Sequence, residues 1–180
     1  MAEAITKTKR YAVVTGSNKG IGFEICRQLA SKGIIVVLTP RDEKKGFEVL
    51  EKLKSDGLSD PMVFCQLDVV DPSSVASLAD FIKSKFGRLD IMVNNVGILG
   101  TKMDWDSLQS SEGSWEEVVS SWKKVMTQSY ELGNECLQMN YYGTKRMIEA
   151  LIPLLQLSDS PRIVSVSSAL GKLEITWQPW

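Results

Sequence analysis

The chain has 180 residues, which is enough for one domain with a substantial buried core. Its 21 basic and 22 acidic residues leave a net charge of −1, which argues against a general nucleic-acid binder and against binding to anionic membranes. Three scattered cysteines and no histidine make a zinc site, and Ser-His or Cys-His catalysis, improbable.

The first predicted element is a buried strand that leads into a glycine-punctuated loop. The apolar run Tyr11–Val14 forms the strand, and a helix is expected from 21 to about 31. Gly16, Gly20 and Gly22 have the spacing Gly-x-x-x-Gly-x-Gly, which is neither the usual Rossmann fingerprint nor a P-loop. Because a helix N-terminus offers unpaired N–H groups and a positive dipole end, the pattern predicts a dinucleotide site. A plain glycine-rich turn is the alternative.

Strands and helices alternate along the rest of the chain. Apolar runs rich in β-branched residues are typical of parallel strands that are covered on both faces. Such alternation implies a doubly wound parallel sheet flanked by helices, a Rossmann-like α/β fold. The four further strands are predicted at Ile34–Thr39, Met62–Leu67, Leu89–Val93 and Ile163–Ser167.

Two of the intervening helices are predicted from apolar spacing. Phe47, Leu50 and Leu53, at i, i+3 and i+6, fall on one stripe of the second helix. A long helix is expected from about Tyr130 to Leu155, with Pro153 near its end.

The third helix is predicted from its end signals. Asp71 is a good N-cap, Pro72 suits the first helical position, and Gly87 is placed to end the helix.

Ligands of such sheets bind outside the carboxyl ends of the strands. The second strand ends in Thr-Pro-Arg, and Arg41 together with Lys19 of the glycine loop suits a 2′-phosphate, so NADP is favoured over NAD. The alternative that Asp42 binds a free ribose hydroxyl stays open. The other strands end in Leu-Asp-Val (67–69), Asn-Asn-Val-Gly (94–97) and Ser-Ser (167–168).

The order of these motifs resembles the short-chain dehydrogenase/reductase superfamily. Thr-Gly-x-x-x-Gly-Ile-Gly is followed by Leu-Asp-Val, Asn-Asn-(Ala)-Gly, Asn140 and Val-Ser-Ser. Segments 19–29, 66–72 and 151–162 are similar to the plant salutaridine reductase and neomenthol dehydrogenase-like group, and the likeness covers roughly residues 10–172. The resemblance implies an NADPH-dependent oxidoreductase that reduces a small carbonyl substrate, a ketone of alkaloid or terpenoid type.

The resemblance also implies roles for cofactor-binding residues. Arg41 matches the contact to the adenosine phosphate, and Asp68 and Val69 match the adenine contacts. Asn95 matches the contact to the ribose on the nicotinamide side, and Gly97 lets the backbone pass near the cofactor ring. The residues that match the pyrophosphate loop are Gly16, Ser17, Asn18, Lys19, Gly20, Ile21 and Gly22.

Two catalytic residues are implied in the same way. Asn140 matches the asparagine that holds a proton-relay water, and Ser168 matches the serine that hydrogen-bonds the substrate carbonyl. The family also needs a Tyr-x-x-x-Lys downstream of the serine, with tyrosine as general acid, and no tyrosine follows Ser168. Tyr141 and Lys145 have this spacing but precede the serine. Adjacent helical residues point about 100° apart, so Asn140 and Tyr141 are not expected to face one small site. Val96 replaces the usual alanine of the family, a mild change.

We therefore expect one incomplete NADP-binding domain over residues 1–180, in which the last strands and helices of the family are missing. Residues 100–128 match an insertion that, in the family, covers the surface used for dimerisation, so a monomer is implied, and 173–180 form a divergent tail. The fifth strand would then be an exposed edge that could pair with a partner. Two functions stay open: a carbonyl reductase, or a catalytically impaired isoform or pseudoenzyme that at most binds NADP(H) or a protein.

The same sequence indicates a soluble, cytoplasmic protein with reduced thiols. Residues 1–10 are polar and lack the apolar core of a secretion signal. No apolar stretch approaches the roughly 18 residues that a membrane span needs.

Overall fold

A computed structural model of the chain describes residues 9–58, 61–104 and 125–168. Its centre is a five-stranded sheet in the order β3-β2-β1-β4-β7, in which every neighbouring pair is parallel. The predicted doubly wound parallel sheet is therefore confirmed. The strands are β1 (Tyr11–Thr15), β2 (Ile35–Thr39), β3 (Met62–Phe64), β4 (Ile91–Asn94) and β7 (Arg162–Ser165).

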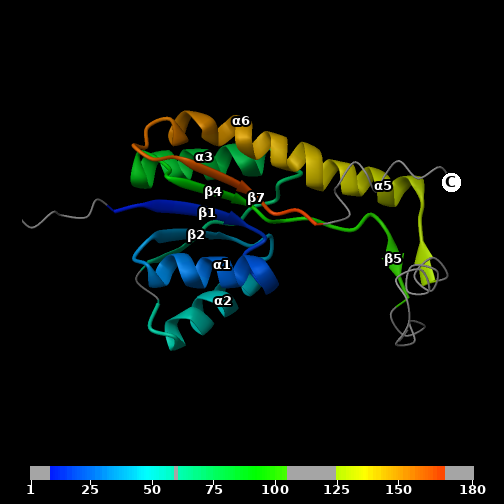
Figure 1. The fold of residues 1–180 in the computed structure, drawn as a ribbon, viewed down its shortest axis with the longest axis horizontal. Helices are drawn as coiled ribbons and strands as arrows, with labels where there is room; N and C mark the ends of the chain where they lie inside the picture. The colour runs from blue at the N-terminus through cyan, green and yellow to red at the C-terminus, as the bar shows by residue number, and fades with distance from the viewer. Residues whose placement is uncertain (1–8, 59–60, 105–124, 169–180) are drawn as a thin grey trace, which may run out of the picture.

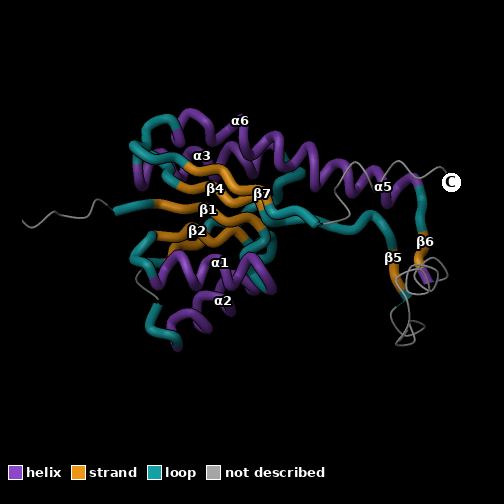
Figure 2. The backbone as a smooth tube through the Cα atoms, in the orientation of Figure 1, coloured by secondary structure: helices purple, strands orange, loops and turns teal. Residues whose placement is uncertain are grey.

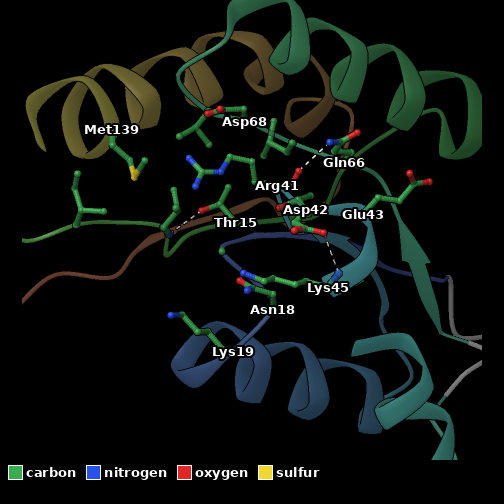
Figure 3. A pocket seen from close by; sticks show the side chains of 16 residues that line it. Thr15, Asn18, Lys19, Arg41, Asp42, Glu43, Lys45, Gln66, Asp68 and Met139 are labelled. Atoms are coloured by element: carbon green, nitrogen blue, oxygen red, sulfur yellow. Dashed lines mark hydrogen bonds between the residues drawn. The ribbon is translucent and has the colours of Figure 1, made fainter. Parts of the chain in front are cut away.

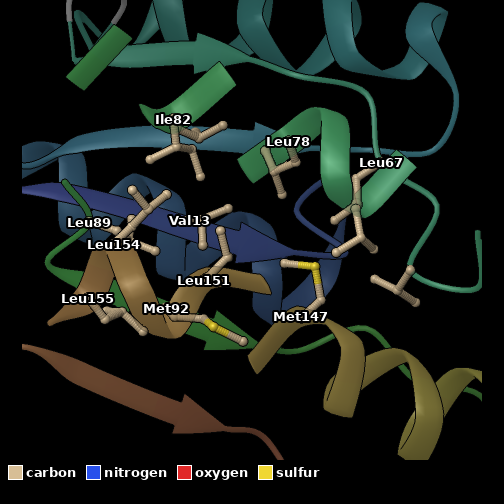
Figure 4. Close-up of a cluster of buried hydrophobic side chains, with 13 residues drawn as sticks. Val13, Leu67, Leu78, Ile82, Leu89, Met92, Met147, Leu151, Leu154 and Leu155 are labelled. Atoms are coloured by element: carbon tan, nitrogen blue, oxygen red, sulfur yellow. The ribbon is translucent and has the colours of Figure 1, made fainter. Parts of the chain in front are cut away.

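Helices cover both faces of this sheet (Figure 1). Neighbouring residues of β1 belong to different hydrophobic clusters: Val13 packs with one, and Ala12 and Val14 pack with the other. This division follows from the alternation of side chains along a strand, and it explains why the strands are continuous apolar runs. The first cluster fills the space beneath α3 and α6 (Figure 4). The covering helices are α1 (Gly20–Ser31) and α2 (Glu43–Ser55) on one face, and α3 (Pro72–Phe86) and α6 (Thr144–Leu155) on the other.

Helix α3 begins and ends where its sequence signals predict. The carboxylate of Asp71 accepts a hydrogen bond from the backbone N–H of Ser73 at 2.9 Å, and Pro72 is the first helical residue. Gly87 follows the last turn with a φ of 75°, in the left-handed region that glycine adopts at little cost. Local sequence alone is enough to define this helix.

Strand β3 is shorter than predicted, because it ends at Phe64 rather than at Leu67. Its neighbour β2 ends at Thr39, and Pro40 follows, which has no N–H group to continue a regular ladder. The chain beyond Phe64 keeps some contact with this segment, since the N–H of Cys65 donates to the carbonyl of Leu38 at 3.0 Å.

The predicted stripe of α2 is buried at Leu53 and packs on the core at Leu50, but Phe47 is 55% exposed, and Val49 is buried as well. A Cβ atom placed on Gly46 would lie only 2.6 Å from the ring of Phe64, so this glycine lets the helix approach the sheet. The close approach turns the Gly46 side of the helix inward and leaves Phe47 at the rim.

The long helix predicted from about Tyr130 is present, but its middle is not α-helical. It consists of α5 (Tyr130–Cys136), the π-helical segment η1 (Leu137–Gly143) and then α6. Gly143 is buried, and a Cβ atom there would lie 2.7 Å from Cγ2 of Val69, so the helix packs against the sheet end only because this residue is glycine. π-Helical turns inside helices often occur at functional sites.

A small antiparallel pair of strands precedes α5. It joins β5 (Lys102–Met103) to β6 (Met126–Thr127), and Figure 2 shows it with α5 at one end of the molecule, away from the main sheet. Both strands lie inside the predicted 100–128 insertion, most of which is outside the described residues, as is the predicted 173–180 tail. Among the described helices, none combines the length and the apolar character needed to span a bilayer.

Candidate functional site: a cleft at the strand ends

A cavity of about 690 Å³ opens at the carboxyl ends of the strands (Figure 3). This volume lies within the range of small-molecule and cofactor sites. The cavity collects residues that are far apart in the sequence, as expected at the ligand-binding edge of an open α/β sheet. They are Thr15, Gly16, Asn18, Lys19, Thr39, Arg41, Asp42, Glu43, Lys45, Gln66, Leu67, Asp68, Val69, Val96, Ile98 and Met139.

The glycine loop presents the N-terminus of α1 to this side of the sheet. Lys19 is the N-cap residue, but its side chain makes no capping hydrogen bond, and the first turn of α1 holds no acidic residue. Its first N–H groups and positive dipole end therefore suit an external anion. A Cβ atom on Gly22 would lie 2.3 Å from the carbonyl oxygen of Gly16, so any larger residue would push the loop apart.

Two polar side chains fix the shape of the loop. The amide nitrogen Nδ2 of Asn95 donates to the carbonyl oxygens of Thr15 and Gly16, at 2.9 and 3.2 Å. On the other side, Oγ of the fully buried Ser17 accepts a hydrogen bond from the backbone N–H of Thr39 at 2.8 Å. The loop is thus tied to β4 and to β2. The ribose contact predicted for Asn95 stays a prediction, since its amide group is engaged with the loop.

Three cationic side chains line one part of the cavity. Arg41 and Lys19 were predicted there, and Lys45, from the first turn of α2, joins them. In Figure 3, the side chain of Lys45 extends toward Asn18, whereas the guanidinium of Arg41 lies on the side of Asp68 and Thr15. Lys45 was not predicted. Arg41 lies before the helix, so their spacing of four residues carries no helical signal, and Lys45 reaches the cavity because α2 begins at this edge of the sheet.

Asp42, the alternative contact to a ribose hydroxyl, is engaged at the start of α2. Its Oδ1 atom accepts hydrogen bonds from the backbone N–H groups of Lys44 and Lys45, at 2.9 and 3.3 Å, so this carboxylate caps the start of α2. The carbonyl of Arg41 is held by Nε2 of Gln66 at 2.8 Å, which fixes the adjacent backbone. A carboxylate engaged in capping is a poorer partner for a ribose hydroxyl, which favours the arginine.

Asp68 and Val69 both line the cavity, as predicted for adenine contacts. The loop that carries them is well ordered: Oδ1 of Asp68 accepts from the N–H of Val70 at 3.0 Å, and the N–H of Asp68 donates to Oγ of Ser74 at 2.9 Å. Arg146 of α6 donates to the carbonyl of Val69 at 3.4 Å. The loop is therefore held in place, while its contact to a base stays a prediction.

Asn140 lies in η1, and its side chain is hydrogen-bonded to the loop that follows β4. Its Oδ1 atom accepts from the N–H of Ile98 at 2.9 Å, and its Nδ2 atom donates to the carbonyl of Ile98 at 2.8 Å. The same Nδ2 atom lies 3.3 Å from Sγ of Cys136, one turn earlier. A Cβ atom on Gly97 would lie 3.3 Å from Oδ1 of Asn140, so the glycine makes room for these hydrogen bonds. Asn140 thereby positions a loop whose residue Ile98 lines the cavity.

The remaining candidates are not brought to this cavity. Ser168 follows β7, is exposed, and does not line the cavity. Tyr141 and Lys145 instead line, together with Asn140, a second, shallower hollow of about 320 Å³. The side-chain amide of Asn140 is hydrogen-bonded to Ile98, whereas Tyr141 is 57% exposed, and the expectation that the two do not face one catalytic site stays a prediction. Nζ of Lys145 lies 3.8 Å from Oε1 of Glu149 in an ion pair, and both side chains are largely exposed.

Within the described part of the chain, no cluster of three or more His, Cys, Asp or Glu side chains could hold a metal ion. The three cysteines form no disulfide. Burial raises the pKa of the Cys26 thiol to about 12 and raises the pKa of Cys65 as well. Neither thiol therefore has the lowered pKa of a cysteine nucleophile.

Comparisons with known proteins agree with this architecture. The sequence model of the family described as short chain dehydrogenase matches residues 10–179. The (+)-neomenthol dehydrogenase of Arabidopsis thaliana is 56% identical over 176 residues, which cover 97% of this chain and 58% of that protein. The structure of salutaridine reductase from Papaver somniferum superposes with a TM-score of 0.83 at 54% identity, covering 92% of this chain and 60% of that one. A short chain dehydrogenase of Escherichia coli CFT073, in complex with NADPH, matches with a TM-score of 0.71 at 27% identity, covering 90% of this chain and 60% of that one.

A parallel sheet with a glycine loop at its carboxyl edge defines a dinucleotide-binding α/β protein. The chain belongs to the short chain dehydrogenase family, a family of oxidoreductases. It spans about three fifths of the length of the relatives that it matches.

Proposed function

We propose that this chain binds NADP(H) and supplies the cofactor-binding part of a reductase that acts on a small ketone of terpenoid or alkaloid type. The observation that carries the proposal is the uncapped N-terminus of α1 beside a cavity lined by three cationic side chains. The names of the relatives, a neomenthol dehydrogenase and a salutaridine reductase, support this substrate class.

Different residues of the chain bind different parts of the cofactor in this proposal. The loop from Gly16 to Gly22 holds the diphosphate with its backbone N–H groups, because no side chain competes for them at the N-cap. Arg41, Lys45 and Lys19 bind the 2′-phosphate, which adds about two negative charges to the adenosine end and is the only group that NAD lacks. The loop at 68–69 lies against the base.

When bound, NADPH supplies a hydride, and the chain orients its ring and excludes water. Val96 and Ile98 form an apolar part of the wall, and the two hydrogen bonds between Ile98 and Asn140 fix that wall. Asn140 as holder of a relay water, and Ser168 as donor to the substrate carbonyl, remain part of this proposal.

A second function is favoured by a specific observation. The 180 residues contain one Tyr-x-x-x-Lys, formed by Tyr141 and Lys145. Tyr141 is 57% exposed and Lys145 lies beside Glu149 rather than near the cofactor cavity. A general acid typically contributes a factor of about 10² to 10⁴ to the rate. These residues alone are therefore proposed to bind the cofactor with little or no turnover.

The first experiment measures dissociation constants for NADPH and NADH by titration, following the fluorescence of the reduced cofactor. Arg41→Ala and Lys45→Ala should each weaken NADPH by about tenfold, as expected for the loss of about 1.4 kcal/mol of charge-assisted contact, and leave NADH nearly unchanged. Lys44→Ala is the matched control, because it removes a neighbouring cation of α2 that does not line the cavity. Equal losses for both cofactors would contradict the 2′-phosphate assignment.

A second measurement separates the two functions. Ketone-dependent oxidation of NADPH should be negligible for the 180-residue chain if it only binds the cofactor. Turnover that is lost in Tyr141→Phe would assign the acid to this tyrosine, and turnover that is lost in Ser168→Ala would support the reductase function.

The remaining expectations are proposals of the same kind. We propose one domain, with residues 100–128 as an insertion and 173–180 as a divergent tail. We also propose that the protein is cytoplasmic and monomeric, because in the family the insertion covers the surface used for dimerisation.

A further inference from the structure

Ser17 belongs to the glycine loop, yet its side chain is fully buried and does not line the cavity. The residues on either side of it, Gly16 and Asn18, both line the cavity. Any effect of the Ser17 side chain on a bound cofactor must therefore pass through other residues. Because a buried hydroxyl group is costly unless it is hydrogen-bonded, its partner shows what Ser17 connects.

The partner of Ser17 is the end of strand β2. Oγ of Ser17 accepts a hydrogen bond from the backbone N–H of Thr39 at 2.8 Å. Oγ1 of Thr39, which is also buried, donates to the carbonyl of Val14 at 2.8 Å. These bonds lie where the parallel register of β1 and β2 ends, at the pair formed by Thr15 and Thr39. The Ser17 bond thus fixes where the glycine loop stands relative to β2.

The connection that follows β2 is short and stiff. Pro40, Arg41 and Asp42 alone separate the end of β2 from the start of α2. The ring of Pro40 fixes its φ angle. The carbonyl of Arg41 accepts a hydrogen bond from Nε2 of Gln66 at 2.8 Å, and Oδ1 of Asp42 accepts from the N–H of Lys45 at 3.3 Å. The position of the β2 end therefore determines where the side chains of Arg41 and Lys45 begin.

The Ser17 bond joins two segments that carry different anion sites in the proposed function. The glycine loop carries the uncapped N-terminus of α1, assigned to the diphosphate, and the connection after β2 leads to Arg41 and Lys45, assigned to the 2′-phosphate. In Figure 3 the side chain of Lys45 extends toward Asn18, the neighbour of Ser17, so the two segments meet at one cavity. NADPH must occupy both sites at once, whereas NADH, which lacks the 2′-phosphate, needs the first alone.

We propose that Ser17 is a positioning residue for cofactor selection, whose hydrogen bond to Thr39 sets the separation between the diphosphate site and the 2′-phosphate site; this inference rests on the proposed function. A ligand that bridges two sites loses affinity when their separation no longer matches its own length, and a ligand held at one site does not. The glycine loop itself stays held in Ser17→Ala, because the hydrogen bonds from Asn95 to Thr15 and Gly16 remain. Loss of the Ser17 hydroxyl should therefore weaken NADPH more than NADH.

The test measures dissociation constants for NADPH and NADH by fluorescence titration of the full 180-residue chain, as wild type, Ser17→Ala and Arg41→Ala. Ser17→Ala should weaken NADPH about fivefold, less than the loss of about tenfold expected for Arg41→Ala because the cation is still present. It should change the NADH constant by less than about twofold. The ratio of the two constants is the readout, since a purely structural defect lowers both affinities alike.

Ser158→Ala is the matched control. Oγ of Ser158 donates to Oδ1 of the buried Asp90, which directly precedes β4, at the edge of the sheet opposite the cavity. The control removes a serine hydroxyl bound to a buried residue and should leave the ratio unchanged. If urea unfolding shows that Ser17→Ala does not fold, Ser17→Cys takes its place, because sulfur is a weak acceptor.

A double variant tests the route of the effect. Once Arg41 is replaced by alanine, Ser17→Ala should change the ratio by less than about twofold, because residues that act through one another are not additive. A wild-type ratio in Ser17→Ala, equal losses for both cofactors, or the full effect in the double variant would overturn the inference while Arg41→Ala still lowers the preference for NADPH. If Arg41→Ala leaves that preference unchanged, the proposed function fails, and the inference fails with it.

Discussion

The replacement of Asn95 by alanine separates a role in building the glycine loop from a role in contacting the cofactor. The side-chain amide makes two hydrogen bonds, at 2.9 and 3.2 Å, to the carbonyls of Thr15 and Gly16. At about 1 kcal/mol net for each bond, Asn95→Ala should lower the free energy of unfolding by about 2 kcal/mol. For a chain of this size that is a fall in Tm of about 4–8 °C.

The assay is thermal and urea unfolding of the cofactor-free protein, followed by NADPH titration of the same samples. If Asn95 builds the loop, the stability of Asn95→Ala falls before any cofactor is added. The NADPH affinity then falls as well, because the binding loop is no longer held. Asn18→Ala is the matched control: it removes an amide from the cavity wall but not these two bonds. Cofactor-free stability within about 0.5 kcal/mol of wild type, with weakened NADPH binding, would refute the reasoning and favour a direct ribose contact.

Three further predictions concern packing, pH and thiol chemistry. Gly143→Ala should lower the free energy of unfolding in urea by about 1–3 kcal/mol, because its Cβ would lie 2.7 Å from Cγ2 of Val69. Gly133→Ala, with open space around it, should raise the same free energy by up to about 1 kcal/mol. Equal effects of the two substitutions would contradict the packing argument. Hydrogen bonds from Ser73 lower the pKa of Asp71, so its stabilising effect is present at neutral pH and is lost as pH falls through the folded-state pKa. The Tm difference between wild type and Asp71→Asn should therefore shrink below about pH 4, and a difference constant with pH would count against it. Cys26, buried and with its pKa raised to about 12, should be alkylated by iodoacetamide at neutral pH only after unfolding, as mass spectrometry can show; labelling of the folded protein would argue against this burial.

The parts of the fold that could be predicted from the sequence are those whose signals are local. Continuous apolar runs identified the strands, and the alternation of strands and helices implied the parallel sheet. The signals at Asp71 and Gly87 placed both ends of α3. The glycine loop was recognised because its conformational demands restrict the residue type.

The features that were missed depend on how distant segments meet. Phe47 lies on the predicted apolar stripe, but the close approach that Gly46 allows to Phe64 turns it outward. The π-helical segment around Asn140 leaves no clear trace in residue spacing. Lys45 lines the cavity only because α2 begins at that edge of the sheet, so its role could not be read from charge alone.

The central claim is that the cavity beside α1 binds the phosphorylated nicotinamide cofactor. The most direct test is a titration of the folded 180-residue chain with NADPH and with NADH, followed by fluorescence of the bound cofactor. The account predicts saturable binding of one NADPH per chain, with a dissociation constant clearly lower than that for NADH. Folded protein that shows no saturable binding of either cofactor would contradict it.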